Sequence, residues 1–327
     1  MSTYENLHGK RVNVVSTNPS NPGDGEVWYN STLGQLKGYV LGSSSFSSGP
    51  DAPISRASTA GGGSSTNAAF VCGGAAPSPT GAGQTATIEY DGTNWASGGP
   101  MSNARRACSG AGTLTAGLAV AGGNNPPFNS VLTACEEYNG TAWTAGGDLN
   151  SQRSSHAAWG TQTAGCMSGG EVTASPSVAG NTEEYNGTAW TVTNPLNTSR
   201  QSNCALGTQT AGLFMGGGPP GKLAEQYNGS TWTNINALAQ PSQSGFSAGT
   251  VTAGIIAGEF PNKTYSQEWD GTNFSTGTAT LATGGAAGSS SKGAPSAGFV
   301  AMLGSNRVNK TEEFTQGVVE VKTLTTS

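Results

Sequence analysis

The chain has 327 residues and 51 glycines, while charged residues make up only 10% of it. Its formal net charge of -5 excludes the clustered positive charge that binding to nucleic acid requires. No apolar run approaches the roughly 18 residues of a spanning helix, so no membrane insertion is expected. The five cysteines form no CxxC pair, which favours buried structural thiols over a disulfide framework.

The first 50 residues lie outside the repeat that follows them. A turn cluster at residues 21–25 precedes two predicted short strands, at residues 26–29 and 35–40. A two-stranded hairpin is marginally stable alone, so its aromatic residues must bury against the main domain, a symmetry mate or another protein. These residues are Trp28, Tyr29 and Tyr39. The Ser/Gly run at residues 42–49 is predicted to be a flexible linker.

A motif built on an aromatic anchor occurs six times in the rest of the chain. Its clearest copy, residues 136–143, reads Glu-Glu-Tyr-Asn-Gly-Thr-Ala-Trp. Successive anchors are 42 to 48 residues apart, and a period in this range is the signature of a repeat architecture. The anchors are Tyr90, Tyr138, Tyr185, Tyr227, Trp269 and Phe314.

Each repeat unit contains the sequence features of four short strands. A segment that carries Arg and small residues is followed by a Thr-x-Thr-Ala-Gly turn, an apolar strand ending in Gly-Gly, the Glu-Tyr strand and the Trp strand. The Asn-Gly or Asp-Gly between the last two supplies the positive φ of a tight hairpin turn. Four such strands describe one blade of a β-propeller. We therefore predict an all-β fold, with a six-bladed propeller at residues 51–327 and an N-terminal attachment hairpin and linker at residues 1–45.

These residues carry two family resemblances. The order of Arg segment, Gly-Gly strand, Tyr strand and Trp strand resembles the kelch repeat over residues 51–327, although units five and six lack the Arg and a complete Gly-Gly. Residues 21–30 with 34–37 resemble a short module near the start of the tail fibres of tailed bacteriophages and of related virion proteins. Together they imply a phage structural protein, in which Trp28, Tyr29 and Tyr39 dock a kelch-type propeller onto the particle.

A Glu directly precedes the anchor in five of the six copies, and Gln226 stands there in the other. A ring of carboxylates could bind a metal or act as acid and base. Repetition favours a structural role, because a catalytic group is needed once whereas a strut between blades is needed every time. We therefore expect each Glu to pair with an Arg of a neighbouring strand or blade, such as Arg106, Arg153 or Arg200.

Known propeller chemistry is missing from the sequence. Kelch enzymes of the galactose-oxidase type need two Tyr, two His and a cross-linked Cys, but this chain has only His8, outside the propeller, and His156. His156 stands in a copy position otherwise filled by Asn203 and Ser109, which indicates a structural role. We expect no catalytic residue, no metal site and no cofactor. A glycan-cleaving enzyme remains an alternative, because carboxylates on loops can converge.

The loops between the second and third strands differ from unit to unit in length and chemistry, whereas the turns on the opposite face are uniform. Rigid scaffolds carry recognition on such variable loops. We therefore predict that ligand contacts come from aromatic and cationic loop residues. They are Phe128, Lys222, Phe260, Lys263, Tyr265, Arg307 and Lys310.

The expected function is attachment to the host surface, as a non-enzymatic tail fibre or adhesin in the virion. The N-terminal segment would bind other virion proteins, and the propeller would face outward to bind a host glycan or receptor. Several copies, or a homo-oligomer, would strengthen weak contacts by avidity. The alternative is a decoration protein of the capsid or tail that stabilises neighbouring subunits without binding the host. In either case the protein would be synthesised and assembled in the host cytoplasm.

Overall fold

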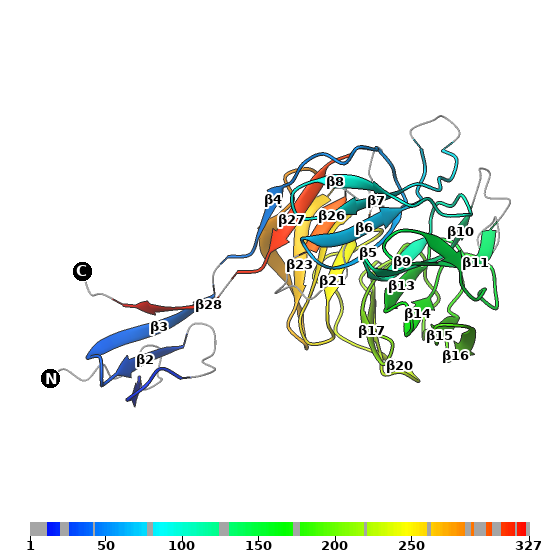
Figure 1. The fold of residues 1–327 in the computed structure, drawn as a ribbon. Helices are drawn as coiled ribbons and strands as arrows, with labels where there is room; N and C mark the ends of the chain where they lie inside the picture. The colour runs from blue at the N-terminus through cyan, green and yellow to red at the C-terminus, as the bar shows by residue number, and fades with distance from the viewer. Residues whose placement is uncertain are drawn as a thin grey trace. The chain divides into compact units, whose positions relative to one another are not determined.

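The computed structural model describes most of the chain as two compact units, one of residues 1–44 with 316–327 and one of residues 45–315 (Figure 1). The described parts of both units are built from β-strands, and no helix in them is long and apolar enough to cross a membrane. The described residues are 12–19, 26–41, 43–76, 81–123, 131–172, 177–218, 221–259, 263–284, 289–290, 299–302, 309–317 and 319–324.

The larger unit contains six four-stranded antiparallel sheets among its described residues. Blades one and two consist of β5 (Ala60–Ser65), β6 (Ala68–Cys72), β7 (Thr87–Tyr90), β8 (Trp95–Gly98), β9 (Ser109–Thr113), β10 (Ala116–Gly123), β11 (Val131–Tyr138) and β12 (Trp143–Ala145). Blades three and four consist of β13 (Ala157–Gly160), β14 (Gly165–Ser168), β15 (Thr182–Tyr185), β16 (Trp190–Thr193), β17 (Cys204–Thr208), β18 (Ala211–Met215), β19 (Ala224–Tyr227) and β20 (Trp232–Asn234). Blades five and six consist of β21 (Phe246–Gly249), β22 (Gly254–Glu259), β23 (Lys263–Trp269), β24 (Phe274–Thr280), β25 (Ser289–Ser290), β26 (Phe299–Met302), β27 (Thr311–Thr315) and β4 (Ser45–Ser48).

The first strands of the blades form a closed ring, since β5 contacts β9, β9 contacts β13, and so on to β25, which contacts β5. The six-bladed kelch-like propeller is therefore confirmed.

The antiparallel order gives the disc two different faces. In blades one to five, the two hairpin turns lie on one, the turn face. The second-to-third loops and the connections between blades lie on the other, the loop face.

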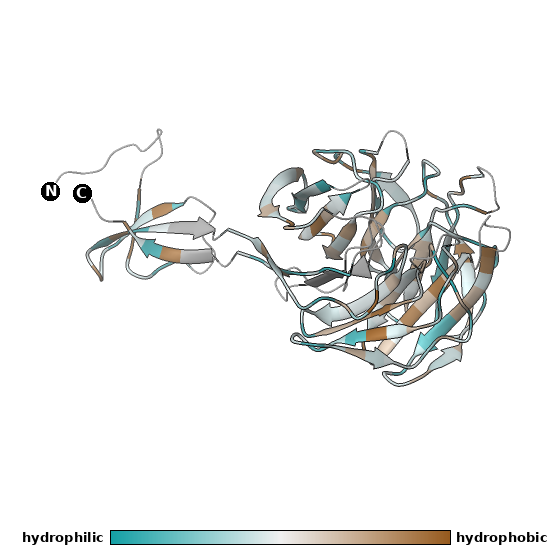
Figure 2. Ribbon diagram, turned by 90° about the horizontal axis from the view of Figure 1, so that it is seen from above, coloured by the Kyte–Doolittle hydropathy of each residue, from teal (hydrophilic) through white to brown (hydrophobic). Residues whose placement is uncertain are grey.

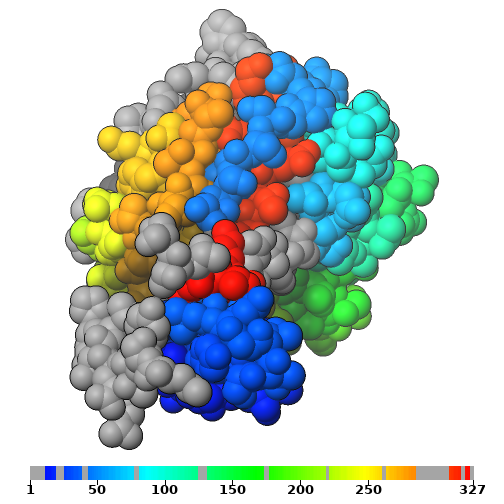
Figure 3. All heavy atoms as spheres, turned by 90° about the vertical axis from the view of Figure 1, so that its left-hand side faces the viewer, coloured from blue at the N-terminus to red at the C-terminus, as the bar shows by residue number. Residues whose placement is uncertain are grey.

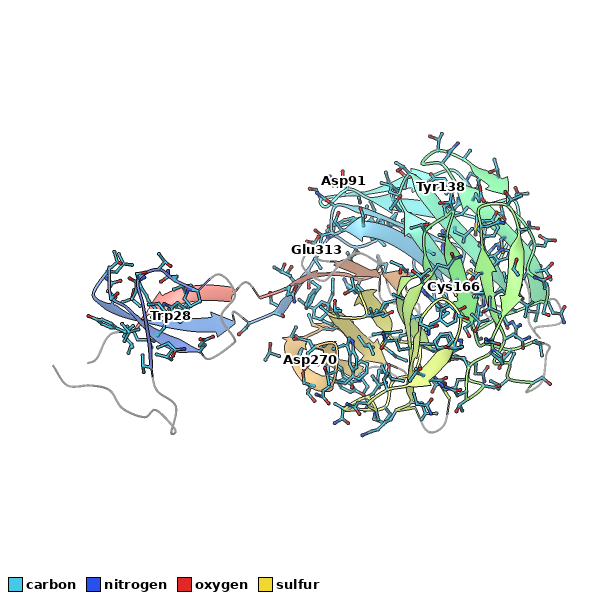
Figure 4. All side chains as sticks on the ribbon, turned by 90° about the horizontal axis from the view of Figure 1, so that it is seen from below. Trp28, Asp91, Tyr138, Cys166, Asp270 and Glu313 are labelled. Carbon is cyan, nitrogen blue, oxygen red and sulfur yellow. The ribbon has the colours of Figure 1, made fainter. Side chains whose placement is uncertain are left out.

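The repeated turn between the third and fourth strands has the predicted hairpin geometry. In blade two, the Asn139 side-chain oxygen accepts hydrogen bonds from the amides of Thr141 and Ala142, both at 2.9 Å. Gly140 has a φ of 89°, which a side chain would disfavour. Asp91 takes the place of Asn139 in blade one and lies at an exposed turn (Figure 4).

The hydrophobic core lies between neighbouring blades rather than at a single centre. One cluster joins Leu118 and Val120 of blade two to Met167, Tyr185 and Trp190 of blade three, and similar clusters join other neighbouring blades. Hydrophobic residues accordingly fall on strands throughout the ring (Figure 2). All six anchors are buried, with at most 4% of their surface exposed. Their predicted role as structural repeat anchors is therefore supported.

The ring is closed by a strand from the beginning of the larger unit. β4 pairs with β27 as the fourth strand of blade six, so segments from the two ends of the propeller lie side by side (Figure 3). Phe46 stands opposite Phe314, with ring centroids 5.2 Å apart, and so takes the place of the Trp in blades one to four. The predicted linker at residues 42–49 is therefore wrong at Ser45–Ser48, which form this strand.

The smaller unit is a four-stranded sheet rather than a hairpin. β1 (Asn13–Val15), β2 (Val27–Asn30) and β3 (Gln35–Leu41) are joined by β28 (Val319–Thr323), which pairs antiparallel with β3. The predicted propeller boundary at residue 327 therefore shifts, because the chain leaves the propeller after β27 and its last residues extend this sheet. β1 and β28 add two strands to the β2–β3 hairpin, which alone would be only marginally stable.

Candidate functional site on the loop face

The propeller is tethered by its turn face. β4 begins and β27 ends at this face, because Ser45 and Thr315 are register partners at the turn end of blade six. Both connections to the smaller unit therefore leave from the side opposite the second-to-third loops. The loop face is the surface on which a ligand would meet non-repeated side chains.

Buried Arg–Glu pairs hold the connections between blades on the loop face. Arg105 donates to Glu136 at 2.6 Å, and the two side chains are 0% and 1% exposed. The same carboxylate accepts hydrogen bonds from the amides of Ser102 and Asn103, at 2.7 and 3.0 Å, in the connection that leads into the blade. Arg200 and Glu225 repeat this pair in blade four. In blades two and four, this carboxylate is therefore engaged by an arginine and by the connection between blades.

Blade three breaks the pattern at Arg153. The Arg153 side chain is completely buried, yet none of its three guanidinium nitrogens has a hydrogen-bond partner among the described residues. Glu183, at the position of Glu136, is instead bonded to the amide and side chain of Asn150. Burial lowers the pKa of Arg153, and Glu183 opposes this effect. The Arg153–Glu183 interaction is thus electrostatic, without the direct contact of the other pairs.

The Glu that directly precedes the anchor does not bind Arg, which corrects the expected pairing. Its carboxylate accepts a hydrogen bond from the anchor Tyr of the next blade: Tyr185 donates to Glu137 at 2.6 Å, and Tyr138 donates to Glu89. Burial and this bond raise the pKa of Tyr185 to about 12. The Glu that pairs with Arg stands one residue earlier, and Arg105 rather than Arg106 is its partner in blade two. Alternate residues of a strand face opposite sides, so the two carboxylates serve different neighbours.

A ring of backbone hydrogen bonds surrounds the axis on the loop face. In five blades, the second residue before the first strand has a φ between 49° and 58°, in the left-handed region that non-glycine residues rarely adopt. From blade two to blade five, the amide of this residue donates to the carbonyl of its counterpart in the preceding blade, at 2.8 to 2.9 Å. The ring residues are Ser58, Ala107, Ser155, Ser202 and Ser244. Such backbone strain persists only where the surroundings impose it, and here the hydrogen-bonded ring does so.

The ring surrounds a cavity of ≈ 150 Å³ on the propeller axis. Residues from five blades line it, most of them Ser, Gly and Ala, and no Asp, Glu, Lys or Arg is among the described lining residues. His156 and Asn203 contribute the largest polar side chains. Both follow a ring residue directly, so the copy position of His156 is filled by Cys108 in blade two, not by Ser109 as the sequence indicated.

His156 is a buried, neutral imidazole. It is 5% exposed, and neither ring nitrogen makes a hydrogen bond of good geometry within the described residues. Its pKa falls to about 3 because burial disfavours the charged ring; Arg153 and Arg105 add repulsion, and the backbone of Val120 opposes the shift weakly. A histidine in this state presents one donor and one acceptor nitrogen.

This shift predicts a pH dependence of stability. The folded pKa of His156, about 3, lies below its ordinary value of 6.5, so the unfolded chain takes up a proton first as the pH falls. The stability contribution of the neutral ring is present above about pH 6.5 and is lost toward pH 3, by up to about 1.4 kcal/mol per pH unit. In urea unfolding, His156→Asn should flatten this dependence. Identical slopes in both proteins would contradict it.

Three of the four predicted loop residues that the structure describes are engaged within the propeller. Lys222 donates to the Ala239 carbonyl at 2.8 Å, and Tyr265 donates to Pro241 at 3.0 Å and to Glu259. The structure thus gathers Lys222 and Tyr265 around one connection between blades, with Lys263 exposed beside them. Lys310 instead forms an exposed ion pair with Asp51 at 2.7 Å. Phe128, Phe260 and Arg307 lie outside the described residues.

Glu259 is a titratable residue that the sequence analysis missed. It is 5% exposed, and burial raises its pKa to about 7, with Tyr265, Ser242 and Lys263 opposing. Its only sequence signal is its position. Glu259 follows Gly258 and stands where other blades have the second Gly of Gly-Gly. None of the described residues belongs to a group of three His, Cys, Asp or Glu that could hold a metal ion.

Glu259 predicts a second, opposite pH effect. Its folded pKa lies above the ordinary 4.5, so its stabilising contribution is present below about pH 4.5 and is lost as the pH rises through about 7. Glu259→Gln should therefore raise the melting temperature relative to wild type at pH 8 more than at pH 5. Equal differences in melting temperature at pH 5 and pH 8 would contradict this assignment.

Comparison with known proteins supports the architecture alone. No family model and no curated protein matches the chain. Among solved structures, one described as "Structure of YjhT" matches with a TM-score of 0.66 and 13% sequence identity, over 84% of this chain and 99% of that chain. Identity this low shows a shared fold, and the likeness is to the propeller fold described above.

Proposed function

We propose that the chain is a non-enzymatic structural protein of a tailed-phage virion, which displays its propeller for attachment to a host surface glycan or protein. The observation that carries this proposal is the tether at Ser45 and Thr315, which leaves the loop face free of the connections to the smaller unit. Repeated contacts hold the interior of the propeller, whereas residues that differ between blades occur on this face. The resemblance of residues 21–37 to a phage fibre module supports the virion context.

The smaller unit is the proposed docking module, with one correction to its expected residues. Trp28 is 0% exposed and donates to Asn18 at 3.2 Å, so it forms the core of the module rather than a docking surface (Figure 4). Tyr29 is 39% exposed, and its register partner Val14 is 69% exposed. The backbone of Tyr39 lies in β3, but its side chain is outside the described residues.

The open side of this small sheet carries a row of apolar residues. Val14, Tyr29 and Leu36 are successive cross-strand partners, and the amide of Leu324 donates to the Leu36 carbonyl at 2.9 Å. Cross-strand partners share a face of the sheet, so the row is continuous. Five of the seven exposed large hydrophobic residues among the described residues belong to this unit, which suits binding to another virion protein.

The experiment that tests the proposal locates the chain in the particle and then measures whether the purified protein competes for host cells. Gold-labelled antibodies against the propeller should bind at a distal position of the virion, and the purified protein should compete with virions for host cells. Labels along the capsid or tail tube, with no competition, would instead favour the decoration protein. Absence of the chain from purified particles would refute both.

Tyr29→Ser should prevent incorporation into particles without changing the melting temperature of the propeller.

A further inference from the structure

The smaller unit contains an edge strand that is paired on one side only. β28 is the last strand of its sheet in the order β1-β2-β3-β28, so its outer edge has no neighbouring strand among the described residues (Figure 1). It spans five residues, whereas β1 at the opposite edge spans three. An open edge presents unpaired N–H and C=O groups, which are a template for pairing with another strand. β28 is therefore the longer of the two edges at which this sheet can be extended.

The hydrogen bonds of β28 show which of its backbone groups face the open side. The amide of Leu324 donates to the Leu36 carbonyl at 2.9 Å, so these two residues form a hydrogen-bonded pair of the antiparallel ladder. Hydrogen-bonded and non-hydrogen-bonded pairs alternate along such a ladder. Val319, Val321 and Thr323 therefore turn their backbone groups away from β3. The open edge offers one N–H donor and one C=O acceptor from each of these residues.

The charges of β28 select one register for pairing with a second copy of the same strand. Its sequence is Val-Glu-Val-Lys-Thr. Two antiparallel copies bring their outward backbone groups together when Glu320, Val321 or Lys322 is the central residue. Centring on Glu320 or on Lys322 sets like charges directly opposite each other, which destabilises a strand pair.

The register centred on Val321 removes this repulsion. It pairs all five residues and sets Glu320 of each copy opposite Lys322 of the other copy. These two pairs fall at non-hydrogen-bonded positions, where facing residues approach most closely. The central pair brings together two Val321 side chains, each 39% exposed in the single chain. Hydrogen bonding, charge and apolar contact thus favour the same register.

We propose that the chain forms a two-fold symmetric dimer, in which β28 of one copy pairs antiparallel with β28 of the other about Val321. The partner is a second copy of this chain, because the complementary charges lie two residues apart on one strand and match when that strand meets itself in reverse. The two four-stranded sheets then form one sheet of eight strands. A two-fold axis perpendicular to this sheet places the apolar rows of both copies on the same face. The pairing does not depend on the attachment role.

Sedimentation of the full chain tests this pairing. Wild-type protein should convert from monomer to dimer as its concentration rises, because a contact of five residues is small. Lys322→Glu and Glu320→Lys should each raise the dissociation constant by about tenfold or more, since both facing pairs then carry like charges. An equimolar mixture of these two variants should associate again, because the facing charges are opposite in the mixed dimer.

A backbone variant and a charge control complete the test. Val321→Pro should abolish the dimer and leave the melting temperature unchanged, because proline is tolerated on an edge strand where its N–H would face solvent. Lys263→Glu makes the same charge change at an exposed lysine of the propeller and should leave the dissociation constant unchanged. The proposal is overturned by a wild-type chain that stays monomeric or forms a trimer, by a dimer that both single variants keep, or by a mixture that fails to associate.

Discussion

Arg105→Leu is expected to lower the free energy of unfolding by about 3 to 5 kcal/mol, because it leaves a buried carboxylate without its cation. Arg105 donates to Glu136 and also to the carbonyls of Ala121 and Ala134, at 3.1 and 2.8 Å. After the substitution Glu136, 1% exposed, keeps only its hydrogen bonds to the connection between blades. Urea unfolding measures the loss, and an unchanged m-value would show that the folded states are comparable.

The same substitution at Arg153 is the matched control and is expected to cost much less. Arg153 is as deeply buried as Arg105, but its guanidinium makes no hydrogen bond within the described residues, so its removal relieves a desolvation cost that Glu183 offsets only in part. Adding Glu136→Gln to Arg105→Leu should recover part of the loss, since it removes the stranded charge. Equal losses at Arg105 and Arg153 would instead assign the stabilisation to packing of the aliphatic part of arginine.

Features that recur in every blade could be predicted from the sequence. The anchor period, the Asn-Gly turns and the buried aromatics each occur several times, so errors in one copy are corrected by the others. The partners of the paired acidic residues were assigned wrongly because Glu136 and Glu137 are adjacent, and only their opposite directions along β11 separate their roles. The strand period predicts that adjacent side chains point to opposite faces of the sheet. It does not predict which neighbouring residue each side chain contacts.

Features that occur once could not be predicted in the same way. His156 gives no sequence signal beyond a copy position, and its place beside the cavity follows from blades that converge on the axis. The closing strand did leave a signal. The sixth copy ends at Phe314 with no Asn-Gly turn and no following Trp, so its fourth strand had to come from elsewhere in the chain. Phe46, the aromatic residue within an otherwise Ser/Gly-rich segment, supplies it.

Removal of β4 is the change expected to damage the propeller most. A fragment of residues 49–315 should be less stable than a fragment of residues 45–315 by at least about 3 kcal/mol. It loses the strand that pairs with β27 and the Phe46–Phe314 contact, and each backbone hydrogen bond adds about 0.5 to 1.5 kcal/mol. Both fragments lack the smaller unit, so the difference reports on ring closure alone.

The shorter fragment should also associate, because an unpaired β27 presents an open sheet edge to other molecules. Sedimentation would show concentration-dependent oligomers for residues 49–315 and a monomer for residues 45–315. A synthetic peptide of residues 43–50 should restore the melting temperature and suppress association, whereas the same peptide with Phe46→Ser should do neither, since β4 offers only Phe46 to the aromatic core of blade six. If both fragments melt alike and stay monomeric, contacts between the inner strands close the ring without β4, and its pairing with β27 is dispensable.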